Sequence, residues 1–387
     1  MSTYTPTKAE QQTYTQPVDG DDPETLLERI LSFLQGLADG AAAAARIAFD
    51  WQPVVSTTFA AVEGCFDASK DLAWWIVGSS ATDKLKGSWD RGRSWNSATI
   101  SAGKTLVTVA TDTSGNGLAL DTAGGGYFGA RSAFATVTWT HHTGVLSTLN
   151  VVAGKAGLCF DPVHGNWIIV WAASTPAIHA NYLNSGFVAT NATIPSSWTS
   201  AAGWADVHVQ ANELGDAIAA MLVTGNFIIG RSTDGGATWV DPTTIPTLSA
   251  PFLAALGGIS RPTYDPVYDE WYVTLASFSG AYTTHVLRST DAGDTWADTG
   301  CVTTDMALVD CEAINGVLVG LDAGGRIFRS VDRGVTWSYV TANAMGNSAS
   351  AGNLKLRAGD GQLLEISRDD AHVCASAVVG ASGGTAQ

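Results

Sequence analysis

The chain has 387 residues, and its 36 acidic side chains exceed its 20 lysines and arginines to give a net charge of −16. An acidic chain without a basic cluster is not expected to bind nucleic acid or an anionic membrane surface, because both partners attract positive charge. Only 14 % of the residues are charged, while 14 Trp, 12 Phe and 9 Tyr are present, which excludes a disordered chain. No apolar run approaches the length of a membrane-spanning helix, and residues 1–22 do not have the pattern of a standard secretory signal.

The first 50 residues are expected to form an arm and a helix. Residues 1–21 are polar and predict an extended or disordered arm. Asp22 and Pro23 suit the start of a helix over residues 22–50. The apolar stripe of this helix has helical spacing and consists of Leu27, Ile30, Leu31, Leu34 and Leu37. Such a stripe needs cover, which the main domain, a second copy of the chain or another protein could supply. We therefore expect residues 22–50 to serve in attachment or oligomerisation.

Residues 51–387 have the pattern of an all-β domain. Short runs rich in Val, Ile, Trp and Tyr alternate with turns rich in Gly, Asp, Asn and Ser. Within this region, an Asp follows a short apolar run at Asp67, Asp161 and Asp265, and a tryptophan-containing run comes after each. These features predict many short strands joined by tight turns.

A second motif, Ser-x-Asp-x-Gly-x-Thr-Trp, recurs in the same region, and we call it the SxDxGxTW turn. It starts at residues 232, 289 and 330, and a fourth copy at residue 88 has Ser in place of Thr. The key positions of these four copies are Ser88, Asp90, Gly92, Trp95, Ser232, Asp234, Gly236, Trp239, Ser289, Asp291, Gly293, Trp296, Ser330, Asp332, Gly334 and Trp337. Degenerate copies keep Ser132 with Trp139, Ser367 with Asp369, and Ser185 with Trp198.

These residue types build turns. Ser and Asp side chains accept backbone N–H groups, Gly permits positive φ, and Trp covers the turn. The role predicted for all of these positions is therefore structural, and none of them is poised for proton transfer.

The motif resembles the Asp-box of sialidase-type (BNR) β-propeller repeats. The seven starts lie on average about 46 residues apart, close to the ~40–50 residues of a four-stranded blade. The resemblance implies an all-β, seven-bladed β-propeller preceded by the arm and the amphipathic helix. A last strand over residues 373–380 is expected to close the ring beside a strand from about residues 52–62.

The resemblance to sialidases covers the repeats only. A sialidase site needs three clustered arginines, a Tyr/Glu pair and an acidic Asp, and the family's early Arg-Ile-Pro segment is absent. Once the arginines of the repeats and the helix are set aside, the remaining ones are Arg261, Arg326 and Arg357. Candidate acids in the β domain are Glu213, Glu270, Asp310 and Glu312. No pair among them stands out, so we assign no catalytic residue; were the protein an enzyme, a glycoside hydrolase is the expected class.

Neither a metal nor a cofactor is predicted. His141 and His142 are adjacent, so on a strand they point to opposite faces. The five cysteines, at 65, 159, 301, 311 and 374, include no CxxC pair, which favours free thiols. Cys301 and Cys311 could pair only if their strands were neighbours.

The leading hypothesis is a non-enzymatic phage virion protein. In such a tail-associated protein the N-terminal segment docks on the particle, and the propeller contacts a host-surface glycan or neighbouring virion proteins. One alternative is a cellular or secreted propeller that binds carbohydrate or resembles the seven-bladed photosystem assembly scaffolds. A second alternative is a divergent sialidase-like glycoside hydrolase. These classes imply a virion location, or else a secreted or cell-surface one.

Overall fold

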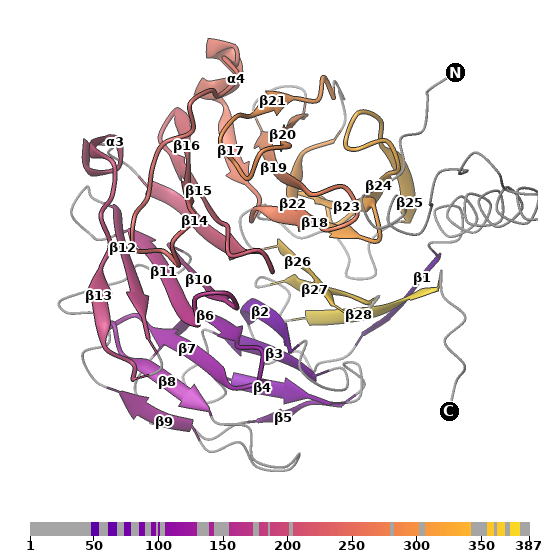
Figure 1. The fold of residues 1–387 in the computed structure, drawn as a ribbon. Coiled ribbons are helices and arrows are strands. Elements are labelled where there is room, and N and C mark those ends of the chain that lie inside the picture. The colour runs from indigo at the N-terminus through magenta and orange to yellow at the C-terminus, as the bar shows by residue number, and fades with distance from the viewer. Residues whose placement is uncertain are drawn as a thin grey trace, which may run out of the picture.

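The computed structural model describes seven antiparallel sheets arranged around a common centre (Figure 1). It describes residues 48–53, 61–67, 73–78, 85–89, 94–97, 100, 105–129, 139–142, 155–172, 178–184, 186–200, 204–278, 282–301, 306–341, 354–359, 362–367 and 372–379. The predicted arm and the helix stripe of Leu27, Ile30, Leu31, Leu34 and Leu37 lie outside these ranges. Among the helices that are described, none is long and apolar enough to cross a membrane.

The sheets are numbered here in chain order. Sheet 1 consists of β2 (Ala61–Asp67), β3 (Ala73–Gly78), β4 (Leu85–Ser88) and β5 (Asn96–Ser97). Sheet 2 consists of β6 (Leu106–Thr111), β7 (Gly117–Asp121), β8 (Gly126–Gly129) and β9 (Trp139–His142). Sheet 3 consists of β10 (Ala156–Asp161), β11 (Asn166–Ala172), β12 (Ile178–Leu183) and β13 (Ala189–Asn191). The short helix α3 (Ser196–Ser200) follows sheet 3.

The remaining sheets repeat this pattern with variations. Sheet 4 consists of β14 (Trp204–Ala211), β15 (Ala217–Val223) and β16 (Asn226–Ser232), and α4 (Ala250–Ala254) follows it. Sheet 5 consists of β17 (Leu256–Ile259), β18 (Thr263–Asp265), β19 (Glu270–Ser277), β20 (Thr283–Ser289) and β21 (Ala297–Asp298). Sheet 6 consists of β22 (Leu308–Ile314), β23 (Val317–Asp322), β24 (Ile327–Ser330) and β25 (Ser338–Thr341). Sheet 7 consists of β26 (Leu354–Gly359), β27 (Gln362–Ser367), β28 (His372–Val379) and β1 (Ala48–Pro53).

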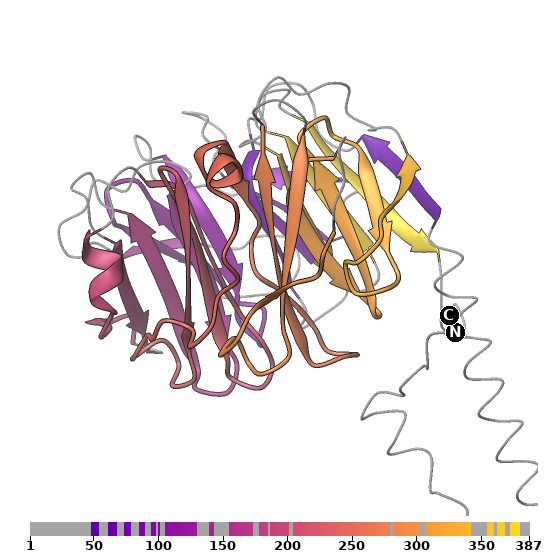
Figure 2. The same cartoon turned by 90° about the horizontal axis from the view of Figure 1, so that it is seen from above.

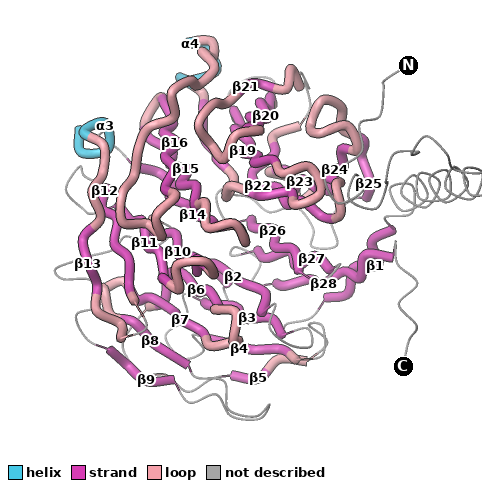
Figure 3. Tube along the Cα trace, in the orientation of Figure 1, coloured by secondary structure: helices cyan, strands magenta, loops and turns pink. Residues whose placement is uncertain are grey.

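The first strands of the sheets form a closed ring around the centre. In order, β2, β6, β10, β14, β17, β22 and β26 each contact the next, and β26 contacts β2 again. Seen from the side, the sheets stand next to one another in a disc (Figure 2). Figure 3 marks the strands of each sheet in magenta and the described loops between them in pink. The described residues form seven sheets; the number of blades expected from the repeat spacing stays a prediction.

The core lies between adjacent sheets. One apolar cluster joins β10–β12 of sheet 3 to β14 and β15 of sheet 4, and similar clusters join the pairs 1–2, 2–3, 4–5, 5–6 and 6–7. All seven residues of β15 are buried, because its two faces contact different neighbours. Continuous apolar runs rather than alternating ones are therefore found in the second strands.

Sheet 7 is built from both ends of the described chain. β1 pairs antiparallel with β28, from Ala48 opposite Val379 to Pro53 opposite Cys374. The expected ring closure beside the last strand is confirmed, but its partner begins earlier than predicted. Residues 48–50 were assigned to the helix of residues 22–50 and lie in β1 instead. Backbone hydrogen bonds to β28 outweigh the local alanine-rich helix propensity there.

Four cysteines of the described residues, Cys65, Cys159, Cys301 and Cys311, lie in the interior. Neither Cys301 nor Cys311 forms a disulfide, so these two do not pair with each other. Burial raises the pKa of the Cys301 thiol to about 11, which makes it a poor nucleophile.

Candidate functional site

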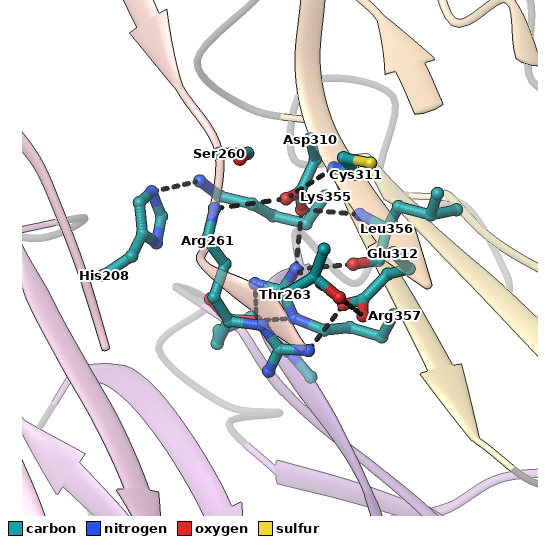
Figure 4. A network of polar contacts seen from close by, with 12 residues as sticks. His208, Ser260, Arg261, Thr263, Asp310, Cys311, Glu312, Lys355, Leu356 and Arg357 are labelled. Atoms are coloured by element: carbon teal, nitrogen blue, oxygen red, sulfur yellow. Dashed lines mark hydrogen bonds and ion pairs between the residues drawn. The ribbon is translucent and has the colours of Figure 1, made fainter. Parts of the chain in front are cut away.

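A cluster of charged side chains lies near the centre of the ring, and we call it the axial cluster (Figure 4). Its members come from sheets 1, 4, 5, 6 and 7 and are Glu63, Asp206, His208, Arg261, Asp310, Glu312, Lys355 and Arg357. Each of the first strands β14, β22 and β26 carries two of these residues, separated by one position. Alternation of side chains along a strand places both members of each pair on one face.

Arg357 on β26 is the most buried cation of the axial cluster, with a side chain that is 1 % exposed. Its Nη1 lies 2.6 Å from Asp310 Oδ2 in sheet 6, and its Nε lies 2.7 Å from Glu63 Oε1 in sheet 1. Burial alone would raise the pKa of both carboxyls, but Arg357, Lys355 and backbone hydrogen bonds together outweigh burial and lower it. Arg357 thus joins sheet 7 to both of its neighbours.

Lys355, also on β26, reaches sheet 4. Its Nζ lies 3.3 Å from Asp206 Oδ2 and 3.4 Å from His208 Nε2, and these two groups are 3.0 Å apart. Burial would raise the pKa of Asp206, yet the neighbouring His208 and Lys355 hold it well below its usual range. This contact links two sheets that are not neighbours in the ring.

Arg261 completes the axial cluster from sheet 5. It lies between β17 and β18, where the innermost strand is interrupted. Its Nη2 lies 2.5 Å from Glu312 Oε1, and Arg357 Nη1 is 3.9 Å from the same oxygen. Burial raises the pKa of Glu312, although both arginines oppose the shift. Thr263 Oγ1 donates to the other carboxylate oxygen at 3.3 Å.

Two of the three arginines that belong to neither the repeats nor the predicted helix therefore converge, but the third does not. Arg326 Nη2 lies 2.6 Å from Asp322 Oδ2 in its own turn. Among the candidate acids, Asp310 and Glu312 join the axial cluster. Glu270 instead bonds the Tyr272 hydroxyl and lies 3.3 Å from Arg333 Nη1, and exposed Glu213 lies in the turn after β14.

The axial cluster can fasten sheets together. Three permanent cations face four carboxylates, and each of these seven side chains contacts an opposite charge in another sheet. Because each of these charges has an opposite charge beside it, the arrangement is a structural ion-pair network between sheets.

The axial cluster makes stability depend on acid. The folded-state pKa of Asp206 is lowered. The ionised carboxylate therefore contributes fully to the free energy of unfolding above the ordinary aspartate pKa of ~3.9, and this contribution is lost as pH falls from there towards the lowered pKa. We expect Asp206→Asn to destabilise the protein at neutral pH by roughly 1–3 kcal/mol. The difference from wild type should shrink towards pH ~3 in urea unfolding. Glu213→Gln, on an exposed turn, is the control; an unchanged difference across this range would contradict the expectation.

The three complete SxDxGxTW turns that are described share one geometry. In the turn at 232, Ser232 Oγ donates to Asp234 Oδ1 at 2.8 Å and accepts from Gly236 N–H at 3.0 Å. Asp234 Oδ1 also accepts from Thr238 N–H at 2.8 Å. The turns at 289 and 330 repeat these bonds, and the glycine has φ of +83° in all three. Burial would raise the pKa of Asp234, but these hydrogen bonds lower it.

Each of these turns packs on the preceding sheet. A Cβ added to Gly236 would lie 2.9 Å from Ile168 of sheet 3, and one on Gly293 would lie 2.2 Å from Ile218 of sheet 4. The exit segment of the preceding sheet also pairs with the turn: Trp239 N–H donates to Thr193 O at 2.8 Å, and Trp296 N–H donates to Thr244 O at 2.9 Å. The turns are therefore contacts between sheets, a role that their local sequence does not reveal.

The other predicted turn positions are only partly covered. Ser88 ends β4, Trp95 precedes β5, Trp139 begins β9, and Ser367 ends β27. Outside the described residues are Asp90, Gly92, Ser132, Ser185 and Asp369. In the complete copies at 289 and 330, the tryptophan directly precedes the last strand of its sheet. Trp198 lies in α3, after the last strand of sheet 3, so it does not take that place. It packs instead on Trp239, with ring centroids 5.4 Å apart.

Asp234 gives a direct test of the turn. Asp234→Ala removes the acceptor of Thr238 N–H and should lower stability by about 1–2 kcal/mol, as loss of a capping side chain does. Asp234→Asn keeps the Oδ1 acceptor and should lose less. Thermal unfolding measures both effects, and partner binding should be unchanged. Lost binding at unchanged stability would refute the structural role.

His141 and His142 point to opposite faces of β9, as expected. His141 stacks on Tyr127 of the same sheet, and His142 stacks on Phe187 of sheet 3. Within the described ranges, no group of three or more His, Cys, Asp or Glu is arranged to hold a metal ion.

Comparison with solved structures identifies the architecture. The structure titled "YCF48 bound to D1 peptide" matches with a TM-score of 0.55 and 12 % identity, over 85 % of this chain and 97 % of that chain. YCF48 from Cyanidioschyzon merolae matches with a TM-score of 0.55 and 13 % identity, over 84 % and 98 %. The fold is a β-propeller. No protein-family model and no curated protein matches the sequence.

Proposed function

We propose that this β-propeller is a binding or structural protein without catalytic activity. The observation that carries the proposal is the axial cluster: its charged side chains are bonded to one another across five sheets rather than directed at a substrate. A partner would then be recognised on the loops at the faces or on the rim, where a large surface such as a protein or a glycan can be contacted. The peptide-bound YCF48 structure is a propeller of this fold that holds a protein segment.

We further propose that residues 1–47 attach the propeller to a larger assembly, most simply a phage virion. The polar arm and the predicted apolar stripe support this role, as does the Gly-, Thr-, Ala- and Ser-rich composition of the β domain. The position of β1 also supports it. Because Ala48 lies opposite Val379 at the end of sheet 7, the preceding segment departs from one defined edge of the ring.

The test compares two deletions in the native particle or complex. Deletion of residues 1–47 keeps all of β1, whereas a cut after residue 49 would remove two of its residues. The shortened chain should be absent from the assembly, as measured by mass spectrometry of purified particles, while its thermal unfolding stays cooperative. Deletion of residues 1–21 alone is the control and should leave incorporation intact. Equal incorporation of both shortened chains would refute the attachment role.

A second candidate is a cellular assembly scaffold that binds a peptide of its client, and the peptide-bound YCF48 structure favours it. Mass spectrometry of the native complex separates the two: virion proteins as neighbours support the first, and cellular clients support the second. Turnover of a fluorogenic sialoside by the full chain would refute both and support the glycoside hydrolase alternative.

A further inference from the structure

Sheets 2 and 6 contain the same turn between their second and third strands. In sheet 2, Asp121 Oδ1 accepts from Gly125 N–H at 2.9 Å; in sheet 6, Asp322 Oδ1 accepts from Arg326 N–H at 2.7 Å. The backbone bonds match as well. Asp121 N–H donates to Gly125 O at 2.9 Å, and Asp322 N–H donates to Arg326 O at 3.0 Å. Gly125 in sheet 2 therefore occupies the position that Arg326 occupies in sheet 6.

The two turns differ at the second carboxylate oxygen. Asp322 Oδ2 receives both Nε and Nη2 of Arg326 at 2.6 Å. Asp121 Oδ2 has no hydrogen-bond partner, although its side chain is 0 % exposed. The group that faces it is His141 Nε2 on β9, at 3.7 Å and also without a hydrogen-bond partner. A buried carboxylate oxygen without a hydrogen-bond partner is costly, and among the described residues His141 is placed to supply a positive charge to it.

Gly125 shows that the approach of His141 is built into the turn. A Cβ at this position would lie 2.6 Å from His141 Nε2 and 2.7 Å from Asp121 Oδ2. A side chain at position 125 would force His141 or the Asp121 carboxylate to shift, so glycine permits their present approach. The histidine ring is further held by stacking on Tyr127, with centroids 4.6 Å apart.

We propose that His141 is a proton-dependent replacement for the arginine of sheet 6, and that its protonated form fastens β9 to the turn of Asp121. An imidazolium supplies the full positive charge that a guanidinium supplies in sheet 6, whereas a neutral ring supplies only a dipole. Among the described residues, the titratable groups placed against His141 are Asp121 on β7 and Tyr127 on β8. Burial and the Asp121 charge raise the pKa of Tyr127, so its hydroxyl stays neutral. The pair is thus a proton-binding site that tightens sheet 2 in mild acid.

The sign of the effect follows from the pairing. A positively charged imidazolium beside the Asp121 carboxylate stabilises the fold in a way that a neutral ring does not, so the contribution is present in mild acid and is lost as pH rises. In the full chain, His141→Gln should lower the melting temperature relative to wild type. This loss should be larger by a few degrees at about pH 5.5 than at about pH 8. His142→Gln, on the opposite face, is the matched control and should show no such change.

Asp121→Asn sharpens the test. The amide keeps the Oδ1 acceptor for the turn and places an NH₂ donor where Oδ2 was. A neutral imidazole can accept a hydrogen bond from this donor. The pH dependence contributed by His141 should therefore reverse in this variant. Two results would overturn the proposal. One is a melting-temperature loss on His141→Gln that is equal at both pH values. The other is a loss that disappears when EDTA is added, because that would reveal a metal site.

If His141→Gln does not fold, hydrogen exchange of wild type gives the answer. After correction for the intrinsic rate, the amides of β9 should be better protected at about pH 5.5 than at about pH 8, while those of β25, the equivalent strand of sheet 6, should not change. Equal protection of β9 at both pH values would overturn the proposal.

Discussion

Arg357→Met should lower the free energy of unfolding by about 3–5 kcal/mol, the largest loss expected for a single charged residue of this protein. Methionine fills most of the volume but leaves the buried Asp310 and the largely buried Glu63 without their cation. Each carboxylate would then either carry an uncompensated charge or take up a proton. The loss is measured by denaturant unfolding at neutral pH.

Arg231→Met is the matched control for this substitution. Arg231 Nη2 lies 3.2 Å from Asp294 Oδ1, and the two side chains are 26 % and 34 % exposed. Partly exposed pairs of this kind contribute roughly 0–1 kcal/mol. A loss for Arg357→Met no larger than that for Arg231→Met would contradict the role assigned to the axial cluster.

Gly293→Ala should be the most disruptive small substitution in the SxDxGxTW turns, with a loss of roughly 2–4 kcal/mol. Two costs combine at this position. The residue has φ of +83°, which an L side chain resists, and the new Cβ would lie 2.2 Å from Ile218 Cδ1 of the preceding sheet. Thermal and denaturant unfolding would both record the change.

Gly300→Ala separates these two costs. Gly300 has a similar φ of +77°, but nothing lies within 4 Å of a Cβ added there. Only the backbone cost remains, about 1–2 kcal/mol. Equal losses for the two variants would show that the packing of the turn on Ile218 contributes nothing, and the interpretation of these turns as contacts between sheets would be wrong.

The strands and turns were predictable because their signals are local. Asp161 and Asp265 each end the first hairpin strand and accept a backbone N–H from the turn that follows, as Asp side chains at turn starts do. The closure of the ring by the last strand was also predictable, because an open sheet edge needs a partner. The end of the predicted helix could not be predicted, because residues 48–50 pair with a strand that lies more than 300 residues later in the chain.

The axial cluster was not predicted, although a signal for it exists. Charged residues two apart on apolar strands occur at 206 and 208, at 310 and 312, and at 355 and 357. Such pairs indicate an inward polar face, because single buried charges are unfavourable. Which charges meet could not be read from the sequence: Arg357 and Glu63 are 294 residues apart, and Lys355 and Asp206 are 149 apart. Only the closed ring of first strands brings them together.

The pairing of β1 with β28 has a consequence for synthesis on the ribosome. The six residues of β1 leave the ribosome more than 300 residues before their partner strand, His372–Val379. At elongation rates of ~5–20 residues per second, the nascent chain carries β1 unpaired for tens of seconds. Until β28 is synthesised, sheet 7 is incomplete and the ring of first strands stays open at this edge.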